Sequence, residues 1–199
     1  MKEPSQTIYF ATSNQGKYLE AVRIVSSFGI RLKRLAVEKY EIQSDKLQEI
    51  ASLAAVQASQ TSSLRVVSED SGFFVKALHN FPGPYSSYAF KTIGPKGILR
   101  LMRESENRDA SFLAAVAYCE PKHAPICFTG QVKGTVSRVA KGTLGFGFDP
   151  IFVPRAGNGR TFAQMDIEEK SVLSHRAKAF TEFARWYVSC RRPGSKEVK

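Results

Sequence analysis

Two neighbouring carboxylates followed by a hydroxyl and a glycine form the segment of this chain with the clearest chemical potential. The apolar run Val66-Val67-Ser68 leads directly into Glu69-Asp70-Ser71-Gly72. Such a run, bounded by polar residues and glycine, predicts a buried strand that ends in a turn, where α/β proteins commonly place their chemistry. Adjacent carboxylates repel each other, so in a loop that is not fully solvated they favour a divalent cation between them. A solvated acidic turn is the alternative.

A second polar segment follows the first predicted strand, residues 8–11, and precedes a helix that ends near Gly29. Its residues are Thr12, Ser13, Asn14, Gln15, Gly16 and Lys17. Free N–H groups at a helix start and the ammonium of Lys17 both suit an anion such as phosphate. The spacing of glycine and lysine is not that of a Walker A loop. An ordinary N-capped helix is the alternative interpretation.

Glycines alternate with aromatic residues in the segment Gly145-Phe146-Gly147-Phe148-Asp149. Glycine lets backbone approach a flat ligand on which a ring can stack, and the aspartate offers an acceptor. The segment therefore predicts a pocket for a base. A bent strand without a ligand is the alternative.

The last segment predicts a helix that is broken near its start. A capping-box pattern at residues 166–169 begins a helical stripe of apolar residues. On one unbroken helix, Lys170 and His175 would point about 140° apart and could not share a small ligand. Ser174 can cap a new helix, so we predict a break that places His175 and Arg176 in a first turn, facing an anion or a carbonyl oxygen. A continuous amphipathic helix is the alternative.

The elements that must position these residues follow from periodicity and from turn residues. We predict strands at 31–37, 112–118 and 126–136, with Gly130 and Gly134 as bends, and helices at 46–61 and 93–104. Glu41 lies in a loop after the strand at 31–37 and is a third candidate carboxylate for a cation. The proline-rich residues 81–86 predict a stiff loop that could wall a pocket.

Composition is that of a soluble globular protein. Of 199 residues, 43% are hydrophobic and 24% are charged, and no apolar stretch approaches the length of a membrane span. We expect a single two-lobed domain over residues 1–190 and a basic flexible tail at 191–199. The polar N-terminus and three cysteines without metal-ligand spacing favour buried thiols in a reducing cytoplasm.

The net charge of +11 raises the question of which class of anionic partner, if any, the protein binds. Clustered Lys and Arg would favour nucleic acid, whereas dispersed charge fits a solvated surface or small polyanions. Here the charge is spread along the chain, with a modest concentration in the tail. This distribution favours a solvated surface over a nucleic-acid groove, so we do not expect nucleic-acid binding. Because no apolar stretch is long enough to span a membrane, we expect no membrane association either.

Six segments in collinear order resemble the inosine-triphosphate pyrophosphatase family, particularly its archaeal members, from Ile8 to about Tyr187. The segments are Thr12 to Lys17, Glu69 to Gly72, Phe81 to Ser86, Gly147 to Phe152, Thr161 to Met165 and Ser174 to Arg176. The resemblance implies a magnesium-dependent homodimer that hydrolyses the purine nucleoside triphosphates ITP, dITP and XTP to the monophosphate and pyrophosphate. It also implies an α/β fold with a long mixed twisted β-sheet flanked by helices, in two lobes with the active-site cleft between them.

The same resemblance assigns roles by position. Asp70 would be the general base, and Glu41, Glu69 and Asp70 would hold Mg²⁺. Residues holding the triphosphate would be Thr12, Asn14, Lys17, Ser71 and Lys170, together with Ser13, Gln15 and Gly16 of the first loop. Residues surrounding the purine would be Phe146, Asp149, His175 and Arg176, with Gly147 and Phe148 of the same segment.

The chain departs from the family in one helix. Some members carry a triphosphate-binding lysine there, whereas this chain has Ala54, Ala55 and Gln57, and Lys91 is a candidate substitute. Two alternatives stay open at this point: a pyrophosphatase for modified pyrimidine triphosphates, and a non-enzymatic nucleic-acid-binding protein. Base preference would test the first, and a steep salt dependence without need for Asp70 or magnesium would indicate the second.

Overall fold

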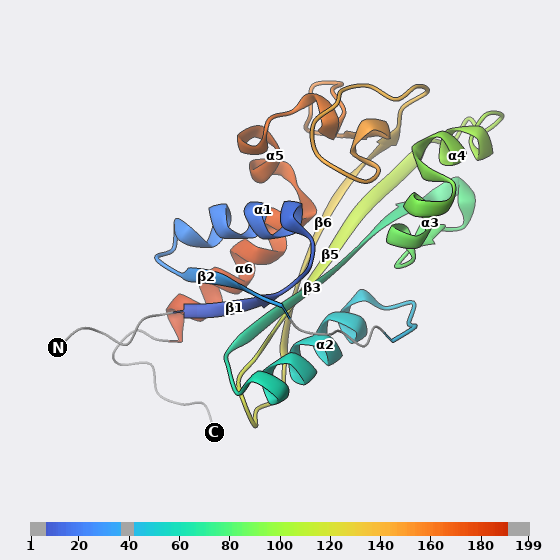
Figure 1. Cartoon of the computed structure of the whole chain (residues 1–199). Coiled ribbons are helices and arrows are strands. Elements are labelled where there is room, and N and C mark those ends of the chain that lie inside the picture. The colour runs from blue at the N-terminus through green and yellow to red at the C-terminus, as the bar shows by residue number, and fades with distance from the viewer. Residues whose placement is uncertain (1–6, 37–41, 191–199) are drawn as a thin grey trace.

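A mixed β-sheet crosses the whole molecule, and helices pack on both of its faces (Figure 1). The structure is a computed structural model that describes residues 7–36 and 42–190. The strands of this part of the chain are β1 (Thr7–Ala11), β2 (Arg31–Leu35), β3 (Val66–Val75), β4 (Pro82–Gly83), β5 (Asp109–Cys119), β6 (Ile126–Val136) and β7 (Phe152–Pro154). Their order is β2-β1-β3-β5-β6-β7, and β4 pairs with β3. The predicted mixed sheet flanked by helices is confirmed.

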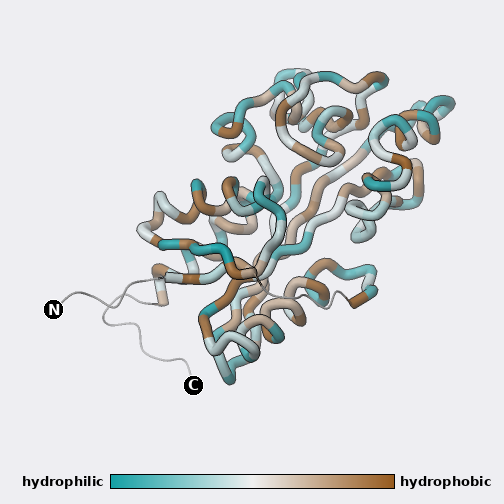
Figure 2. Tube along the Cα trace, viewed as in Figure 1, coloured by the Kyte–Doolittle hydropathy of each residue, from teal (hydrophilic) through white to brown (hydrophobic). Residues whose placement is uncertain are grey.

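Both pairing modes occur in this sheet. Strand β1 runs parallel to β2 and β3, whereas β3, β5, β6 and β7 pair antiparallel in succession. The helices are α1 (Gln15–Ser26), α2 (Leu47–Ser62), α3 (Ser86–Thr92), α4 (Gly94–Leu101), α5 (Ile167–Leu173) and α6 (His175–Ser189), with 3-10 turns at Lys76–Leu78, Asp149–Ile151 and Phe162–Gln164. Hydrophobic residues recur along the central strands (Figure 2).

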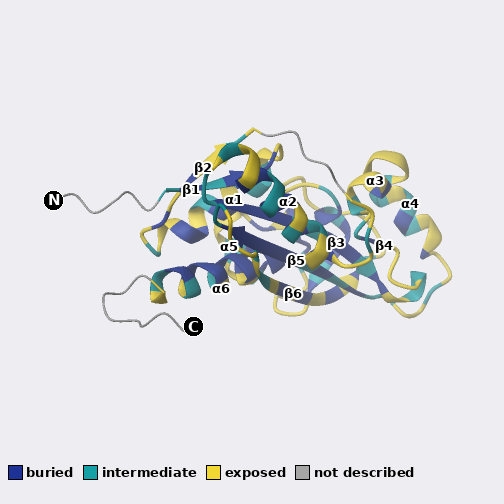
Figure 3. Ribbon diagram, turned by 90° about the horizontal axis from the view of Figure 1, so that it is seen from below, coloured by how far each residue is buried: buried dark blue, intermediate teal, exposed yellow. Residues whose placement is uncertain are grey.

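Two large hydrophobic clusters define two lobes that share the long strands β3, β5 and β6. In the first lobe, α1 and α6 pack on β1 and on the adjoining ends of these strands, and the rings of Phe10 and Phe180 meet edge to face. In the second lobe, the Phe73 ring stacks on Phe148 and packs against Phe112 beneath α4. Helix α2 covers the opposite face of the sheet. Strand β5 is buried between these layers (Figure 3).

The acidic segment lies within a strand, so the predicted turn at Glu69 and Asp70 is wrong. Strand β3 continues to Val75 because β5 pairs with it throughout, from Val66 opposite Cys119 to the far end. On its other edge, β3 pairs with β1 only at 66–67 and with β4 only at 73–74. Among the described strands, none pairs with 68–72 on that edge, so the acids lie where the sheet opens between the two lobes.

Other element boundaries differ moderately from prediction. The strands predicted at 31–37 and 112–118 are Arg31–Leu35 and Asp109–Cys119, and the helix predicted at 46–61 is Leu47–Ser62. The helix predicted at 93–104 ends at Leu101, and α3 precedes it without having been predicted. Gly94, with φ +60°, is the first residue of α4 and breaks the helical path after α3. The prediction missed α3 because the helix has only seven residues and Tyr85, the residue before it, provides no side-chain cap.

Three further expectations concern the cysteines, membrane-spanning helices, and residues that the structure does not describe. Cys119 is buried as expected, but Cys190 is exposed. Within residues 7–36 and 42–190, no helix is long and apolar enough to cross a membrane. Glu41 and the tail at 191–199 lie outside the described residues.

Gly130 and Gly134 are positions of close approach in a continuous β6, not the bends that were predicted. A Cβ added at Gly130 would lie 2.1 Å from the carbonyl oxygen of His175 and 2.6 Å from the backbone nitrogen of Ala179. One at Gly134 would lie 2.2 Å from the carbonyl oxygen of Val153. Gly130 therefore lets the first turns of α6 rest directly on the sheet.

We predict that Gly130→Ala lowers the free energy of unfolding by about 1–3 kcal/mol, because α6 must move away from β6 to make room for the methyl group. Thr129→Ala, at the neighbouring exposed position of the same strand, is the matched control and should change it by less than about 0.5 kcal/mol. Urea denaturation followed by circular dichroism measures both. Equal stability of the two variants would contradict the close packing.

Candidate active site

A cleft with a volume of about 500 Å³ lies between the lobes. Its walls come from the loop before α1, the middle of β3, α3 with the loop before it, residues 146–149, and the junction of α5 and α6. These segments are distant in the sequence and meet at the open edge of β3. The fold therefore brings most of the chemically notable segments to one place.

Most predicted site residues line this cleft. They are Thr12, Ser13, Asn14, Lys17, Glu69, Asp70, Ser71, Phe146, Gly147, Phe148, Asp149, Lys170, His175 and Arg176. Gln15 and Gly16 are not in the lining. The Gln15 side chain instead accepts a hydrogen bond from Arg34 at 2.8 Å, and the space beside Gly16 is taken by the Phe146 ring.

Several lining residues were not among the predicted site residues. These are Gly72, Pro84, Ser86, Ser87, Phe90 and Phe112. Lys91, the candidate substitute for the missing helix lysine, also lies in the lining. The proline-rich loop at 81–86 was expected to wall a pocket, and Pro84 and Ser86 do so. Phe112 carried no signal, because a phenylalanine in an apolar strand is typical of a core.

The start of α1 has both features considered for it, an N-cap and a cation. The Asn14 side chain accepts a hydrogen bond from the backbone N–H of Lys17 at 3.0 Å, and Thr12 Oγ1 accepts one from Asn14 N–H at 3.2 Å. The Lys17 ammonium lies 2.7 Å from Glu69 Oε2. The lysine thus faces the cleft while paired with a carboxylate of β3.

The predicted break between the last two helices is confirmed. Helix α5 ends at Leu173, and Ser174 has extended backbone with its hydroxyl accepting from Ala177 N–H at 3.0 Å. His175 and Arg176 consequently form the first turn of α6, at the cleft. The capping box of Asp166 with Glu169 at the start of α5 is also present.

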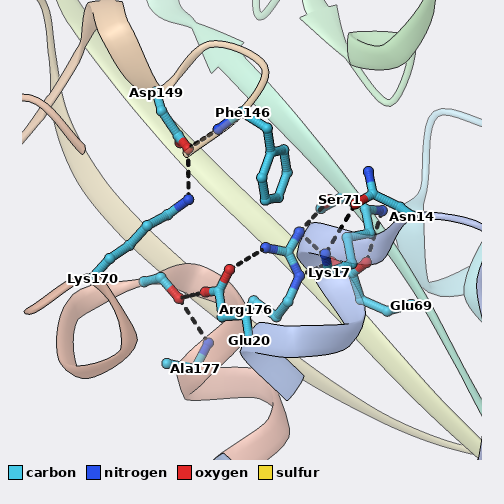
Figure 4. A network of polar contacts seen from close by, with 11 residues as sticks. Asn14, Lys17, Glu20, Glu69, Ser71, Phe146, Asp149, Lys170, Arg176 and Ala177 are labelled. Carbon is cyan, nitrogen blue, oxygen red and sulfur yellow. Dashed lines mark hydrogen bonds and ion pairs between the residues drawn. The ribbon is translucent and has the colours of Figure 1, made fainter. Parts of the chain in front are cut away.

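A buried guanidinium joins three elements at the base of the cleft (Figure 4). Arg176, 1% exposed, donates to Glu20 Oε2 of α1 at 2.8 Å and to Glu69 Oε1 of β3 at 3.0 Å. It also donates to the Ser71 hydroxyl at 3.2 Å. Glu20 in turn accepts from the hydroxyl of Ser174, so the helix break and the ion pair are connected. Sequence reasoning missed Glu20, which resembles any polar residue of an amphipathic helix.

The charge of Glu69 is maintained by its partners. Burial opposes its ionisation, but the charges of Arg176 and Lys17 outweigh burial and lower its pKa to about 2. Glu69 is therefore ionised at neutral pH. With both of its oxygens engaged by cations, it is less available to a metal ion than its sequence neighbour Asp70.

A second buried pair lies on the opposite side of the cleft. Lys170 donates to Asp149 Oδ2 at 2.6 Å, and the same oxygen accepts from Phe146 N–H at 2.8 Å. Burial raises the pKa of Asp149, while Lys170 acts in the opposite direction. The Lys170 ammonium also lies 4.6 Å from the centre of the Phe146 ring. Asp149 and Lys170, predicted to bind different parts of a ligand, thus bind each other here.

His175 is a neutral imidazole stacked on an aromatic ring. Burial, reinforced by the charge of Arg176, lowers its pKa well below the ordinary value. Its ring lies parallel to that of Phe112, with centroids 4.8 Å apart. Among the described residues, no group forms a hydrogen bond with its buried Nδ1. A ligand in the cleft could supply that bond.

The side chains that line the cleft include oxygen ligands that suit a divalent cation. Within residues 7–36 and 42–190, no three His, Cys, Asp or Glu side chains form a metal-binding group. Mg²⁺, however, is commonly held by one or two carboxylates together with substrate phosphates and water. Asp70 lines the cleft and matches that pattern. Because the cations Lys17, Lys170 and Arg176 already pair with carboxylates, a polyphosphate would need additional positive charge. The residues therefore fit such an ion.

This chain is similar to known proteins both in sequence and in structure. The sequence model of the Ham1 family matches residues 8–186. A dITP/XTP pyrophosphatase of Methanopyrus kandleri is 47% identical over 180 residues, covering 90% of this chain and 95% of that protein. Another from Saccharolobus solfataricus is 47% identical over 178 residues, covering 89% and 92%. The structure of a HAM1 protein from Coxiella burnetii has a TM-score of 0.82 at 28% identity, covering 92% of this chain and 98% of that one.

We predict that Glu69→Gln lowers the free energy of unfolding by about 3–5 kcal/mol at pH 7, because Arg176 would lose one of its two buried carboxylates. The pKa of Glu69 is depressed from 4.5 to about 2, so its stabilisation is complete above pH 4.5 and is lost as pH falls towards 2. The difference between wild type and variant should therefore shrink over that window in urea titrations at several pH values.

The matched control for this prediction is Glu182→Gln, which removes an exposed ion pair with Arg185 and should cost less than about 1 kcal/mol. A stability difference between wild type and Glu69→Gln that does not change between pH 2 and 4.5 would contradict the assigned ion pairs.

Proposed function

The chain belongs to the Ham1 family, and we propose that its cleft hydrolyses the non-canonical purine nucleoside triphosphates ITP, dITP and XTP to the monophosphate and pyrophosphate. The chain is accordingly a hydrolase of nucleoside triphosphates. Its two archaeal relatives of 47% identity carry the name dITP/XTP pyrophosphatase. The family resemblance of the six sequence segments is confirmed. The alternative of a non-enzymatic nucleic-acid-binding protein is not supported.

One observation carries the proposal: a single cleft presents phosphate-binding and base-binding chemistry side by side. The start of α1 contributes N–H groups and Lys17. Next to it, Phe146, His175 and Arg176 provide a ring, a neutral imidazole and a guanidinium. A nucleotide whose phosphates lie along α1 and whose base lies against Phe146 would use both sets of residues.

We assign the removal of a proton from the attacking water to Asp70. The carboxylate lies on β3 at the open edge of the sheet, next to the loop that would hold the phosphates. Water attacks the α-phosphorus, its proton passes to the carboxylate, and the bond from the α-phosphorus to the bridging oxygen breaks to release pyrophosphate. Lys17 would contact the phosphates while it stays close to Glu69.

Discrimination of the base would rest on hydrogen bonding in a buried site. Hypoxanthine and xanthine carry an acceptor oxygen at position 6, where adenine carries an amino donor. Neutral His175 can donate from one nitrogen. Arg176 can only donate, and its bonds to Glu20, Glu69 and Ser71 leave one of its five N–H groups for a ligand. A buried donor facing another donor loses its bond, which can lower the rate for the wrong substrate by orders of magnitude. ATP is therefore expected to be a poor substrate.

A magnesium requirement, a homodimer and a cytoplasmic location stay predictions. Asp70 would hold Mg²⁺ together with the phosphates, and the bound ion would neutralise charge on the leaving pyrophosphate. Glu41 remains a candidate ligand. For a homodimer, the large exposed side chains Phe81, Tyr85 and Tyr88 on and beside α3 offer a surface that a partner could cover.

Product analysis with separate substrates tests the proposed function. The full chain is incubated with ITP, XTP, GTP and ATP in Mg²⁺ and then in chelator, and the products are separated by anion-exchange chromatography. We expect monophosphate and pyrophosphate from ITP and XTP, at least about a hundredfold faster than from ATP, since adenine opposes a buried donor. Chelator should abolish the reaction. Release of inorganic phosphate, or equal cleavage of all four, would contradict the proposal.

We predict that Asp70→Asn lowers kcat for ITP by at least about a hundredfold, because the amide cannot accept the proton of the attacking water. Asp109→Asn, a carboxylate of β5 that does not line the cleft, is the matched control and should keep wild-type kcat. Circular dichroism checks that both variants are folded. Wild-type kcat in Asp70→Asn would exclude this residue as the base.

A further inference from the structure

A separate hollow, of about 420 Å³, lies on the outer side of the second lobe, and no described residue lines both it and the cleft. It is lined by Lys96, Leu99, Arg100, Arg103, Arg108 and Arg138. Five of its six lining residues are thus cations. Helix α4 lies at the edge of the molecule, remote from α1 and α6 (Figure 1). None of these residues takes part in the proposed hydrolysis.

Helix α4 and the turn after it bring three of the cations together. Lys96 and Arg100 are four residues apart on the helix and therefore on one face. Arg103 follows in the turn after the helix. Arg138 approaches from the segment after β6. The positive charges thus come from two separate parts of the chain and surround one space.

Arg108 is held in a fixed position beside the others. Its Nε donates to the carbonyl of Val136 at 2.6 Å, its Nη1 to that of Met102 at 3.0 Å, and its Nη2 to that of Ser137 at 2.8 Å. Burial lowers its pKa, and the nearby charge of Arg138 lowers it further. These bonds use three of the five guanidinium N–H groups, so two remain for a ligand.

Within the described residues, no carboxylate lines the hollow, in contrast to the cleft. Among the described residues, none of its five cations forms an ion pair, whereas Lys17, Lys170 and Arg176 of the cleft are all paired. Like charges brought together at a surface repel one another, and an anion bound between them removes that repulsion. Arginine forks match phosphate oxygens in particular.

We propose that this hollow is a second, non-catalytic binding site for a compact anion that carries several phosphate charges, such as an inorganic oligophosphate. A nucleic-acid strand fits less well. The exposed Glu104 and Glu106, in the loop between Arg103 and Arg108, would repel a backbone that continues past the hollow. In the part of the chain that the structure describes, no aromatic ring lines it for stacking of bases. The six-residue lining is also short for a strand-binding track.

Calorimetric titration of the full chain with sodium tripolyphosphate, in low salt without divalent metal, tests the site. Lys96→Ala/Arg100→Ala should weaken binding by roughly tenfold or more, since two cation–phosphate contacts are lost. Arg31→Ala/Lys33→Ala removes the same residue types from exposed positions of β2, and this matched control should bind as wild type does. Arg103→Ala, outside the helix, provides a second variant if the first does not fold.

Two further arms identify the ligand and the location. Lys17→Ala should retain tripolyphosphate binding. If Lys17→Ala instead loses binding while Lys96→Ala/Arg100→Ala binds as wild type does, the anion binds in the catalytic cleft and the proposal is overturned. A fluorescent oligothymidylate that binds more tightly than tripolyphosphate through Lys96 and Arg100 would also overturn it, in favour of nucleic acid. Because binding is the readout, failure here leaves the proposed hydrolysis untouched.

Discussion

The buried guanidinium of Arg176 is the interaction on which the arrangement of the cleft depends. It joins Glu20 of α1, Glu69 of β3 and its own position in the first turn of α6. Removing a charge from water is costly unless the charge is fully paired. Helices α1 and α6 and strand β3 are therefore held in the arrangement that pairs the guanidinium. The Ser174 hydroxyl extends the same network to the helix break. Folding and the assembly of the cleft are thereby coupled.

The long strands have a complementary role, because they are common to both lobes. Strand β3 contacts β1 in the first lobe and β4 in the second, and its middle residues lie between these partners. The cleft is therefore not added to the sheet as a separate loop structure. It forms where β3 changes its neighbouring strand on one edge. On the other edge, β3 pairs with β5 along its whole length, and this pairing fixes the backbone that carries the carboxylates.

Local features of the site could be predicted from the sequence, and long-range ones could not. The Asn14 cap and the break at Ser174 depend on neighbouring residues only, so their patterns were sufficient. The role of Glu20 depends on Arg176, which is 156 positions away. The extension of β3 depends on β5 in the same way, since adjacent acids and a glycine look like a turn without a partner strand. Family resemblance supplied much of the site assignment that local patterns left open.

The ion pairs within the cleft affect which anions can compete with the substrate for binding. Lys17, Lys170 and Arg176 each face a carboxylate at hydrogen-bonding distance, so the resting cleft offers little net attraction to a bare anion. Abundant phosphate or sulfate should consequently compete poorly with the substrate. A nucleotide that arrives with its own countercharge avoids that barrier, and so the cleft selects for the ionic state of its ligand as well as for its base.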